Sequence, residues 1–316
     1  MANILATPRF WKTQAVLLKA GVTLNTDSVP TGAANWFEAR NVALTSMEPE
    51  AVDRNVVQAY FGRSGSVITA MWAKLSFDIA LAASGTAGTA PKWSPGMLAA
   101  GFAVTNVPVT SDTYNLISSA FGFADLYMNI DGVLYKFVSA RGNVKCKITA
   151  KGIPVLSFDF TSVFAVPVTS AMFTPITKTG WPSELGVNSV NTGKVTINAV
   201  DLAFSTLDWD AGNQIAKINL PGPQLEVAIT DRQPTASITV LAPALATFDP
   251  YTLANAGTNV ALSNTHGTVA GAKVKNDLKV RITNVKEEQI ENMLAYTLTM
   301  EPTPVSGNDE ITVTCL

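Results

Sequence analysis

Short segments in which apolar and polar residues alternate recur along the whole chain. Such period-two alternation is typical of β-strands that turn one face towards a core. The clearest segments are LSFDI (75–79), VKCKI (144–148), LSFDF (156–160), ASITV (236–240), LKVRI (278–282) and AYTLT (295–299). In NIDGVLYKF, Asp131-Gly132 is a strong signal for a two-residue hairpin. The pattern therefore predicts a mainly β protein.

Two segments begin as helices. In Ser94–Gly101 a serine suited to capping precedes a proline at the first helical position, and Asp249–Gly257 has the same order. The pattern predicts one short α-helix in each half of the chain.

Five segments recur in the same order in the two halves, which indicates a tandem duplication. The matched pairs are 43–62 with 203–222, LSFDI (75–79) with ASITV (236–240), the two helix starts, KIT (147–149) with RIT (281–283), and LSFDF (156–160) with LAYTL (294–298). A length of 316 residues also favours two domains. We expect domains over residues 1–166 and 167–316, the first with an N-terminal arm over residues 1–20.

The segment STLDWDAGN (205–213) has the aspartate spacing that opens a calcium loop. Counted from Asp208, however, position 5 is Gly212 and position 12 is Asn219, where such a loop needs an oxygen ligand and a bidentate glutamate. The matching EPEAVD (48–53) has a proline and no glycine turn. We interpret both as a repeated acidic connection and expect no metal site.

The sequence offers little catalytic chemistry. Its single histidine, His266, stands in the loop-like SNTHGTVAG, where we expect it to be solvated, and no G-x-S-x-G elbow, P-loop or dinucleotide motif occurs. Asp78 and Asp159 could be a glycosidase pair, but alternation places both on polar strand faces. Cys146 is expected in the core, and with Cys315 it forms no metal or redox spacing. We expect no enzyme, no catalytic residue and no cofactor.

Charge is scarce. Charged residues make up 15% of the chain, against about 25% in ordinary soluble domains, while apolar residues reach 47%. No apolar run approaches the roughly 18 residues of a membrane helix, and the N-terminus does not have the form of a signal peptide. The net charge of −2 gives no global basic field for nucleic acid. We expect a protein made in a reducing cytoplasm whose surface is largely covered by partners.

Three segments, Ser28–Thr45, Ser84–Phe102 and Gly212–Pro243, resemble major tail tube proteins of long, non-contractile-tailed bacteriophages. The resemblance implies β-sandwich or barrel domains with a short flanking helix, in subunits that form stacked rings around a DNA channel. The related tube fold of type VI secretion systems has one domain per chain and six chains per ring. Two domains per chain therefore predict homotrimeric pseudo-hexamers.

The same resemblance implies partners and a location. The partners would be further copies of the chain, the tape measure protein, the tail tip and the tail terminator, with DNA passing without sequence-specific binding and with no membrane. The location would be the virion tail, assembled in the bacterial host cytoplasm. A carbohydrate-binding or adhesin-like β-sandwich is the alternative, and it would need aromatic platforms. The tryptophans Trp36, Trp72, Trp93, Trp181 and Trp209 share no spacing that would make one.

The alternation also predicts which residues would face a channel. If Leu75, Phe77 and Ile79, with Leu156, Phe158 and Phe160, form the core, the opposite face carries Ser76, Asp78, Ser157, Asp159, Ser237, Thr239 and Thr297. This face lines either the channel or the wet exterior. Contacts between subunits are expected from Phe10 and Trp11 in the N-terminal arm, and from Ile311 and Val313 in EITVTCL (310–316).

Overall fold

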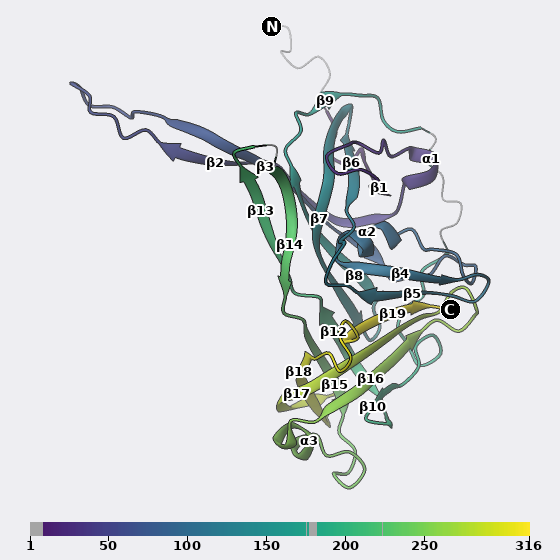
Figure 1. Cartoon of the computed structure of the whole chain (residues 1–316). Helices are drawn as coiled ribbons and strands as arrows, with labels where there is room; N and C mark the ends of the chain where they lie inside the picture. The colour runs from purple at the N-terminus through teal and green to yellow at the C-terminus, as the bar shows by residue number, and fades with distance from the viewer. Residues whose placement is uncertain (1–8, 175, 177–181, 223) are drawn as a thin grey trace, which may run out of the picture.

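The structure is a computed structural model that describes residues 9–174, 176, 182–222 and 224–316 (Figure 1). Strands make up 54% and helices 6%, which confirms the predicted mainly β class. All six alternating segments lie in strands. Asp131 and Gly132 both have positive φ, 41° and 89°, as the predicted tight hairpin requires.

The first half of the chain, as we use the term, runs to β9. Its elements are β1 (Gln14–Ala20), α1 (Gly32–Asn35), β2 (Ala39–Asp53), β3 (Ser66–Ala80), α2 (Ser94–Ala99), β4 (Phe102–Val107), β5 (Ser111–Leu116), β6 (Ala124–Ile130), β7 (Val133–Thr149), β8 (Val155–Val163) and β9 (Val168–Thr169).

The second half begins at β10. Its elements are β10 (Val195–Ile197), β11 (Val200–Leu202), β12 (Phe204–Asp210), β13 (Asn213–Leu220), β14 (Gln224–Arg232), β15 (Thr235–Leu241), α3 (Pro250–Ala256), β16 (Asn259–His266), β17 (Val274–Ile290), β18 (Met293–Pro302) and β19 (Ile311–Cys315).

The two halves have the same strand path. In the first half, antiparallel pairing runs β1–β6–β7–β8–β3–β2. In the second half it runs β10–β16–β17–β18–β15–β12. The helices also have matching places along the chain: α2 follows β3, and α3 follows β15, which has the place of β3 in the second path. This agreement supports the tandem duplication, which stays our proposal.

Strand pairing also gives a register for comparing the halves. Phe77 pairs with Phe158, and its counterpart Ile238 pairs with Leu298. Phe158 therefore corresponds to Leu298. The sequence match of LSFDF with LAYTL had set Phe158 against Tyr296, which is two residues before Leu298 on the same face of β18. KIT lies at the end of β7, whereas RIT lies in the middle of β17, so these two segments do not occupy equivalent places.

Each half closes around a core because one long strand belongs to two layers. The pairing of β7 passes from β6 to β8 at a bulge between Val138 and Arg141. The pairing of β17 passes from β16 to β18 near a bulge between Ile282 and Asn284. A bulge bends its strand and increases the twist, so the strand can cross from one sheet to the other.

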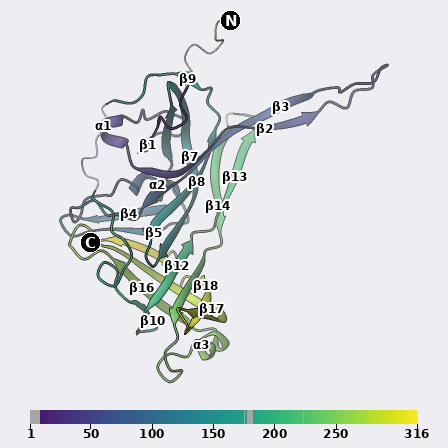
Figure 2. The same ribbon diagram turned by 180° about the vertical axis from the view of Figure 1, so that it is seen from behind.

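The halves are joined by strands. The end of β7 pairs with β12, which makes one sheet of eight strands in the order β2–β3–β8–β7–β12–β15–β18–β17. On the other layer, β19 pairs with both β17 and β5 of the first half. Figure 2 shows β12 and the C-terminal strand lying between the two halves.

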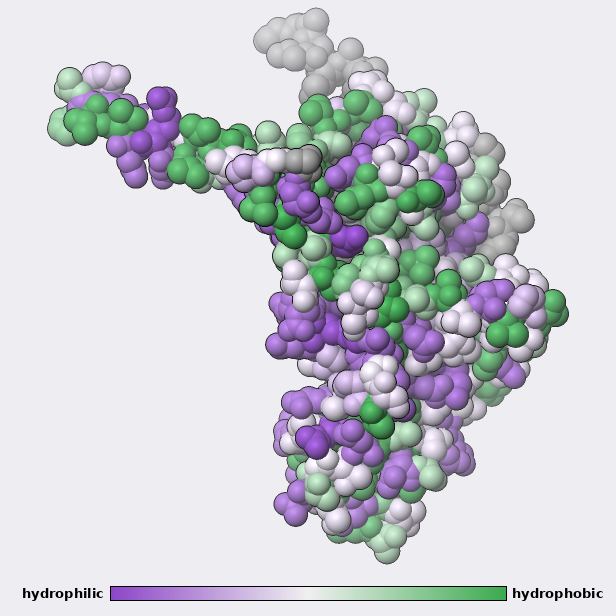
Figure 3. All heavy atoms as spheres, in the orientation of Figure 1, coloured by the Kyte–Doolittle hydropathy of each residue, from purple (hydrophilic) through white to green (hydrophobic). Residues whose placement is uncertain are grey.

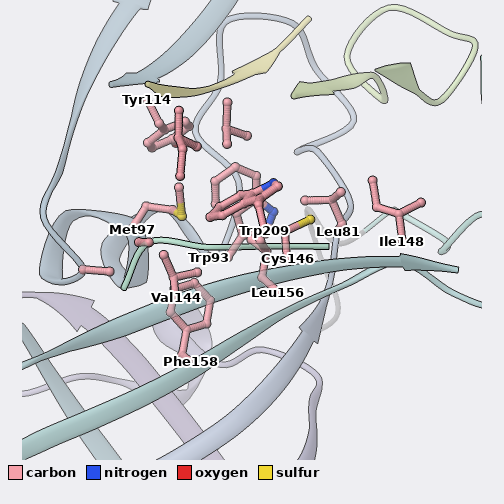
Figure 4. Packing of buried hydrophobic residues seen from close by; sticks show 14 of the residues in the cluster. Leu81, Trp93, Met97, Tyr114, Val144, Cys146, Ile148, Leu156, Phe158 and Trp209 are labelled. Carbon is pink, nitrogen blue, oxygen red and sulfur yellow. The ribbon is translucent and has the colours of Figure 1, made fainter. Parts of the chain in front are cut away.

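The core lies between these layers and passes without interruption from one half to the other. Val144, Cys146 and Ile148 of β7 pack in one core with Trp209 of β12 and with Trp93, which precedes α2 (Figure 4). Cys146 is 1% exposed, which confirms its predicted place in the core, and burial raises the pKa of its thiol. The apolar face of the eight-strand sheet is thus covered within the body of the protein, and its polar face is left for function.

The two predicted helices form, but they begin differently. For α3, the Asp249 side chain accepts hydrogen bonds from the backbone N–H groups of Tyr251 and Thr252, as the predicted helix start requires. Gly257 ends this helix in the left-handed conformation. Ser94 was wrongly predicted as the cap of α2: it is a buried residue of the first turn, after Trp93. Pro95 is accommodated because backbone N–H groups of a first turn have no partner within the helix.

Candidate functional site

The polar face of the eight-strand sheet carries all seven residues predicted to face a channel. Ser76 pairs with Asp159 and Asp78 with Ser157, so these four form one patch on β3 and β8. Thr239 pairs with Thr297, and their hydroxyls are 2.9 Å apart. Ser237 lies on the same face of β15. The structure therefore brings these residues onto one surface, in two clusters separated by β7 and β12.

Lysines lie among these acidic and hydroxyl groups, and the sequence analysis had not assigned them to this face. Lys145 and Lys147 of β7 are exposed opposite the buried Val144, Cys146 and Ile148. Lys74 on β3 and Lys286 on β17 also belong to the polar side. The missed signal was the strand alternation in VKCKI, which had been used only for its apolar positions. The face carries mixed charge rather than acid alone.

Charges meet at the joint between the halves. Lys145 lies opposite Asp210, with 3.0 Å between Nζ and Oδ2, and Lys147 lies opposite Asp208. Burial raises the pKa of Asp208, partly offset by Lys147. These residues surround a hollow of about 370 Å³ that also includes Ser157 and Ser237.

The acidic connection predicted for STLDWDAGN is wrong, because residues 205–210 belong to strand β12. Leu207 and Trp209 are buried in the core, so Asp208 and Asp210 point to the polar face by alternation. EPEAVD likewise lies within β2. Among the described residues, no cluster of three or more histidine, cysteine, aspartate or glutamate side chains could hold a metal ion.

The eight-strand sheet ends in two strand edges. In the part of the chain that the structure describes, β2 pairs with β3 alone, and β17 beyond Ile282 pairs with β18 alone. A free edge presents unpaired backbone N–H and C=O groups and invites pairing with another strand. These two edges lie at opposite ends of the sheet order, as they must if one copy is to join the next.

β2 and β3 continue beyond the body of the protein as an arm, which we define as residues 47–71 (Figure 1). Hydrophobic side chains are spread along it (Figure 3). The large exposed ones are Met47, Val52, Val56, Val57, Tyr60, Phe61, Val67 and Ile68. So many apolar side chains in water indicate a surface that another molecule covers.

The matching hairpin of the second half is bent. β12 and β15 continue as β13 and β14 after a corner at Ala211-Gly212 and Gln233-Pro234. Gly212 has φ +65°, and a Cβ there would lie 2.0 Å from the Gln233 carbonyl oxygen. Glycine is thus needed for this close approach of two backbones. Beyond the corner, β13 and β14 pack against β7, and β14 also against β8.

The two ends of the chain are placed differently. Phe10 and Trp11 are exposed, although the Phe10 backbone N–H is tied to Asp131 Oδ2 at 2.6 Å. Ile311 and Val313 are completely buried in β19, between β5 and β17. Their burial assigns Ile311 and Val313 to the core of their own chain. Phe10 and Trp11 remain candidates for contacts between subunits.

His266 was wrongly predicted to be a solvated loop residue. It ends β16, is 2% exposed and lies 2.9 Å from the Thr192 hydroxyl through Nδ1. Burial lowers the pKa of its imidazole. The local sequence could not predict this burial, because the β-bridge that covers His266 comes from Thr192, a residue distant in the chain.

The tryptophans do not form an aromatic platform among the described residues. Trp72, Trp93 and Trp209 are buried, and Trp36 is partly buried beside Leu17. Trp181 lies outside the described residues. No helix in the described ranges has the length and apolar character to cross a membrane.

Comparison with known proteins gives one family. A family model described as phage tail tube protein matches residues 11–315, almost the whole chain. No curated protein matches the sequence.

Proposed function

Because the chain belongs to the phage tail tube protein family, we propose that three copies close into a ring and that stacked rings form a channel for phage DNA. Membership itself makes the chain a structural protein of the virion tail that self-assembles into a tube. The ring, the channel and assembly in the host cytoplasm belong to the proposal, as do contacts with the tape measure protein, tail tip and terminator.

The observation that carries the ring is the β7–β12 joint. It pairs residues 145–149 of the first half with residues 206–210 of the second. In the order of the eight-strand sheet, β17 ends the second half as β7 ends the first, and β2 begins the first half as β12 begins the second. We infer that β17 of one copy pairs with β2 of the next, which would satisfy both free edges.

Strand registers predict the pairs. Val144 pairs with Phe158 and Val285 with Leu298, so Lys145 corresponds to Lys286. On the other strand, Asp210 pairs with Thr235 as Thr45 pairs with Lys74, so Thr45 corresponds to Asp210. The matching of 43–62 with 203–222 had set Thr45 against Ser205, five residues away. The pairing of Lys145 with Asp210 thus predicts that Lys286 faces Thr45 of the neighbouring copy.

Three copies of the eight-strand sheet would give a barrel of 24 strands. With strands about 4.8 Å apart and tilted by about 40°, its backbone would be roughly 45–50 Å across. That leaves room for a DNA duplex inside the side-chain layer. A polar face of mixed charge, with lysines offset by acids, would hold few phosphates and so let DNA slide.

Cross-linking between cysteines tests the ring. The variant carries Lys286→Cys and Thr45→Cys, both at exposed positions, and is treated with a short bis-maleimide after assembly. Cys146 and Cys315 are buried and should not react. We expect a gel ladder that ends at three chains, because a closed ring offers no fourth partner.

The controls are the two single-cysteine variants and a variant that combines Thr45→Cys with Thr105→Cys on β4. A ladder ending at six chains would overturn the ring of three. Intact tubes with no cross-linked chains would overturn the edge pairing. Compact monomers in negative-stain electron microscopy, under conditions where related tubes assemble, would overturn the proposed function as a whole.

A further inference from the structure

We propose that the arm of one copy docks on the second half of its neighbour in the same ring, across the end of α3 and the adjacent part of β17. This inference rests on the proposed ring and names a surface and its occupant. The occupant is a second copy of the chain, because each chain already contains the equivalent contact between its own halves.

That internal contact is the seat of the β13–β14 hairpin on the first half. Asn213 donates from Nδ2 to the carbonyls of Ala100, 2.7 Å away at the end of α2, and Gly142, 3.0 Å away in β7. Arg141 donates from Nη1 to the Val227 carbonyl at 2.8 Å and pairs with Glu226. The hairpin is therefore fixed by hydrogen bonds at both its base and its middle.

Apolar contacts complete the seat. The Ile229 side chain lies beside Gly101, just after α2, and beside the ring of Phe121. Ile229 is 7% exposed and Val227 is 1% exposed. The middle of the hairpin also contacts the base of the arm, where Lys217 pairs with Glu48 at 2.8 Å.

The second strand of the arm can be matched to the second strand of this hairpin. The offset that sets Phe77 on Ile238 sets Ile68 on Ile229 and Thr69 on Thr230. Between the paired residues Ala43 and Ser76 there are 32 residues, and between Asp208 and Ser237 there are 28. The two hairpins are therefore of nearly equal length, but Ile68 is 47% exposed where Ile229 is covered.

The surface equivalent to the seat is exposed in the second half, where the Arg281 guanidinium lies against Gly257 and donates from Nε to its carbonyl at 2.8 Å. Gly257 ends α3 as Gly101 follows α2, and Asn284 on β17 corresponds to Asn143 on β7. α2 is mostly buried, whereas Pro250 is the one buried residue of α3. Between α3 and β16 the described chain has no hairpin corresponding to β4–β5, which follows α2 in the first half, and all residues of α3 after Pro250 are partly or fully exposed. The additional apolar side chains of the arm, Tyr60 and Phe61, are suited to cover it.

Ile68→Cys combined with Ala256→Cys tests the docking in assembled tubes. Ala256 is the exposed last residue of α3, next to Gly257. Docking within one ring predicts cross-linked chains in a ladder that ends at three. Docking on the next ring would give an open ladder along the tube and would overturn the proposal, since contacts between rings do not close.

The control pair is Ile68→Cys with Thr105→Cys, which should give no ladder. A second measurement is amide hydrogen exchange of α3, which we expect to be about tenfold slower in tubes than in unassembled chains. Ile68→Asp should abolish that protection. If Lys286→Cys with Thr45→Cys closes a ladder while Ile68→Cys with Ala256→Cys gives none, the arm docking is wrong and the ring stands.

Discussion

The two long hairpins of this chain have nearly the same length and the same place in their half, yet one packs against the body of the protein and the other extends into water. β13–β14 turns at Gly212 and covers β7 and β8, while the arm leaves the body without a glycine at its base. The base of the arm has Glu48-Pro49 and bulges instead. The corner at Gly212 thus lets one hairpin fold back onto its own chain, whereas the arm, which has no such corner, is left free to contact a neighbouring copy.

The comparison also shows what each hairpin needs. The covered hairpin has polar anchors, Asn213 and Arg141, that find partners in the same chain. The arm has apolar side chains, and its described anchors lie near its base, where Lys217 pairs with Glu48 and Asn219 donates to the Thr69 carbonyl. Substitutions at equivalent places in the two hairpins should therefore act on different quantities: folding in one, assembly in the other.

The largest effect is expected from an aspartate at the matched isoleucines. Ile229→Asp would bury a charge beside Phe121 and should lower the free energy of unfolding by about 4 kcal/mol or more. Ile68→Asp should change it by less than about 0.5 kcal/mol, because that side chain is exposed. Denaturant unfolding of unassembled chains measures both. Equal losses would show that the arm is folded onto its own chain.

The corner glycine should come next. Gly212→Ala adds a Cβ against the Gln233 backbone at positive φ and should cost about 3 kcal/mol, whereas Gly65→Ala in the arm should cost about 1–2 kcal/mol, from its φ alone. Gly65 has φ +78° and no heavy atom within 4 Å of an added Cβ. Thermal unfolding of the two variants checks the difference, and a Gly212→Ala protein as stable as Gly65→Ala would contradict the role of the corner.

The polar anchor should have a smaller effect. Asn213→Ala leaves the carbonyls of Ala100 and Gly142 without their donor, and we expect a loss of about 2 kcal/mol. Asn219→Ala is the matched control, because Asn219 donates to the Thr69 carbonyl in an exposed place. Faster hydrogen exchange in β13 and β14 of Asn213→Ala would locate the loss.

The smallest effect concerns the ion pair between Lys217 of the β13–β14 hairpin and Glu48 at the base of the arm. Lys217, and to a lesser extent Lys74, hold the pKa of Glu48 below its ordinary value. Because the folded pKa is depressed, this contribution is present above about pH 4.5 and is lost as the pH falls through the folded pKa. Glu48 is partly exposed, so we expect a few tenths of a kcal/mol. Glu48→Gln should flatten the pH dependence of unfolding below pH 5; an unchanged curve would mean that the pair is fully screened.

The polar face gives a test on the assembled tail. Asp78→Lys with Asp159→Lys should allow tubes to form and should slow DNA ejection, more strongly at low salt, where attraction between lysine and phosphate is less screened. Ser76→Lys in the same patch is the comparison for adding a charge without removing one. Ejection at the wild-type rate from intact tubes would place this face outside the channel.

Local sequence determined much of this protein. Strand alternation placed Cys146 in the core and Asp78 on the polar face, and Asp131-Gly132 set a hairpin. Asp249 and Gly257 fixed both ends of α3, because capping depends on residues within one or two turns. The matching segments also indicated two similar halves, which the equal strand paths support. In each case the determining contacts lie close along the chain or follow from period-two geometry.

Tertiary structure decided which edges meet. Nothing in VKCKI or STLDWD states that β7 pairs with β12, because an edge strand presents the same backbone groups to any partner. The same is true of β19, whose Ile311 and Val313 read as a free terminal strand but close the sheet between the halves. His266 looked solvated for this reason too, since Thr192 reaches it from 74 residues away. Pairing between distant strands depends on shape and space in the folded chain, and these arise only once both halves are formed.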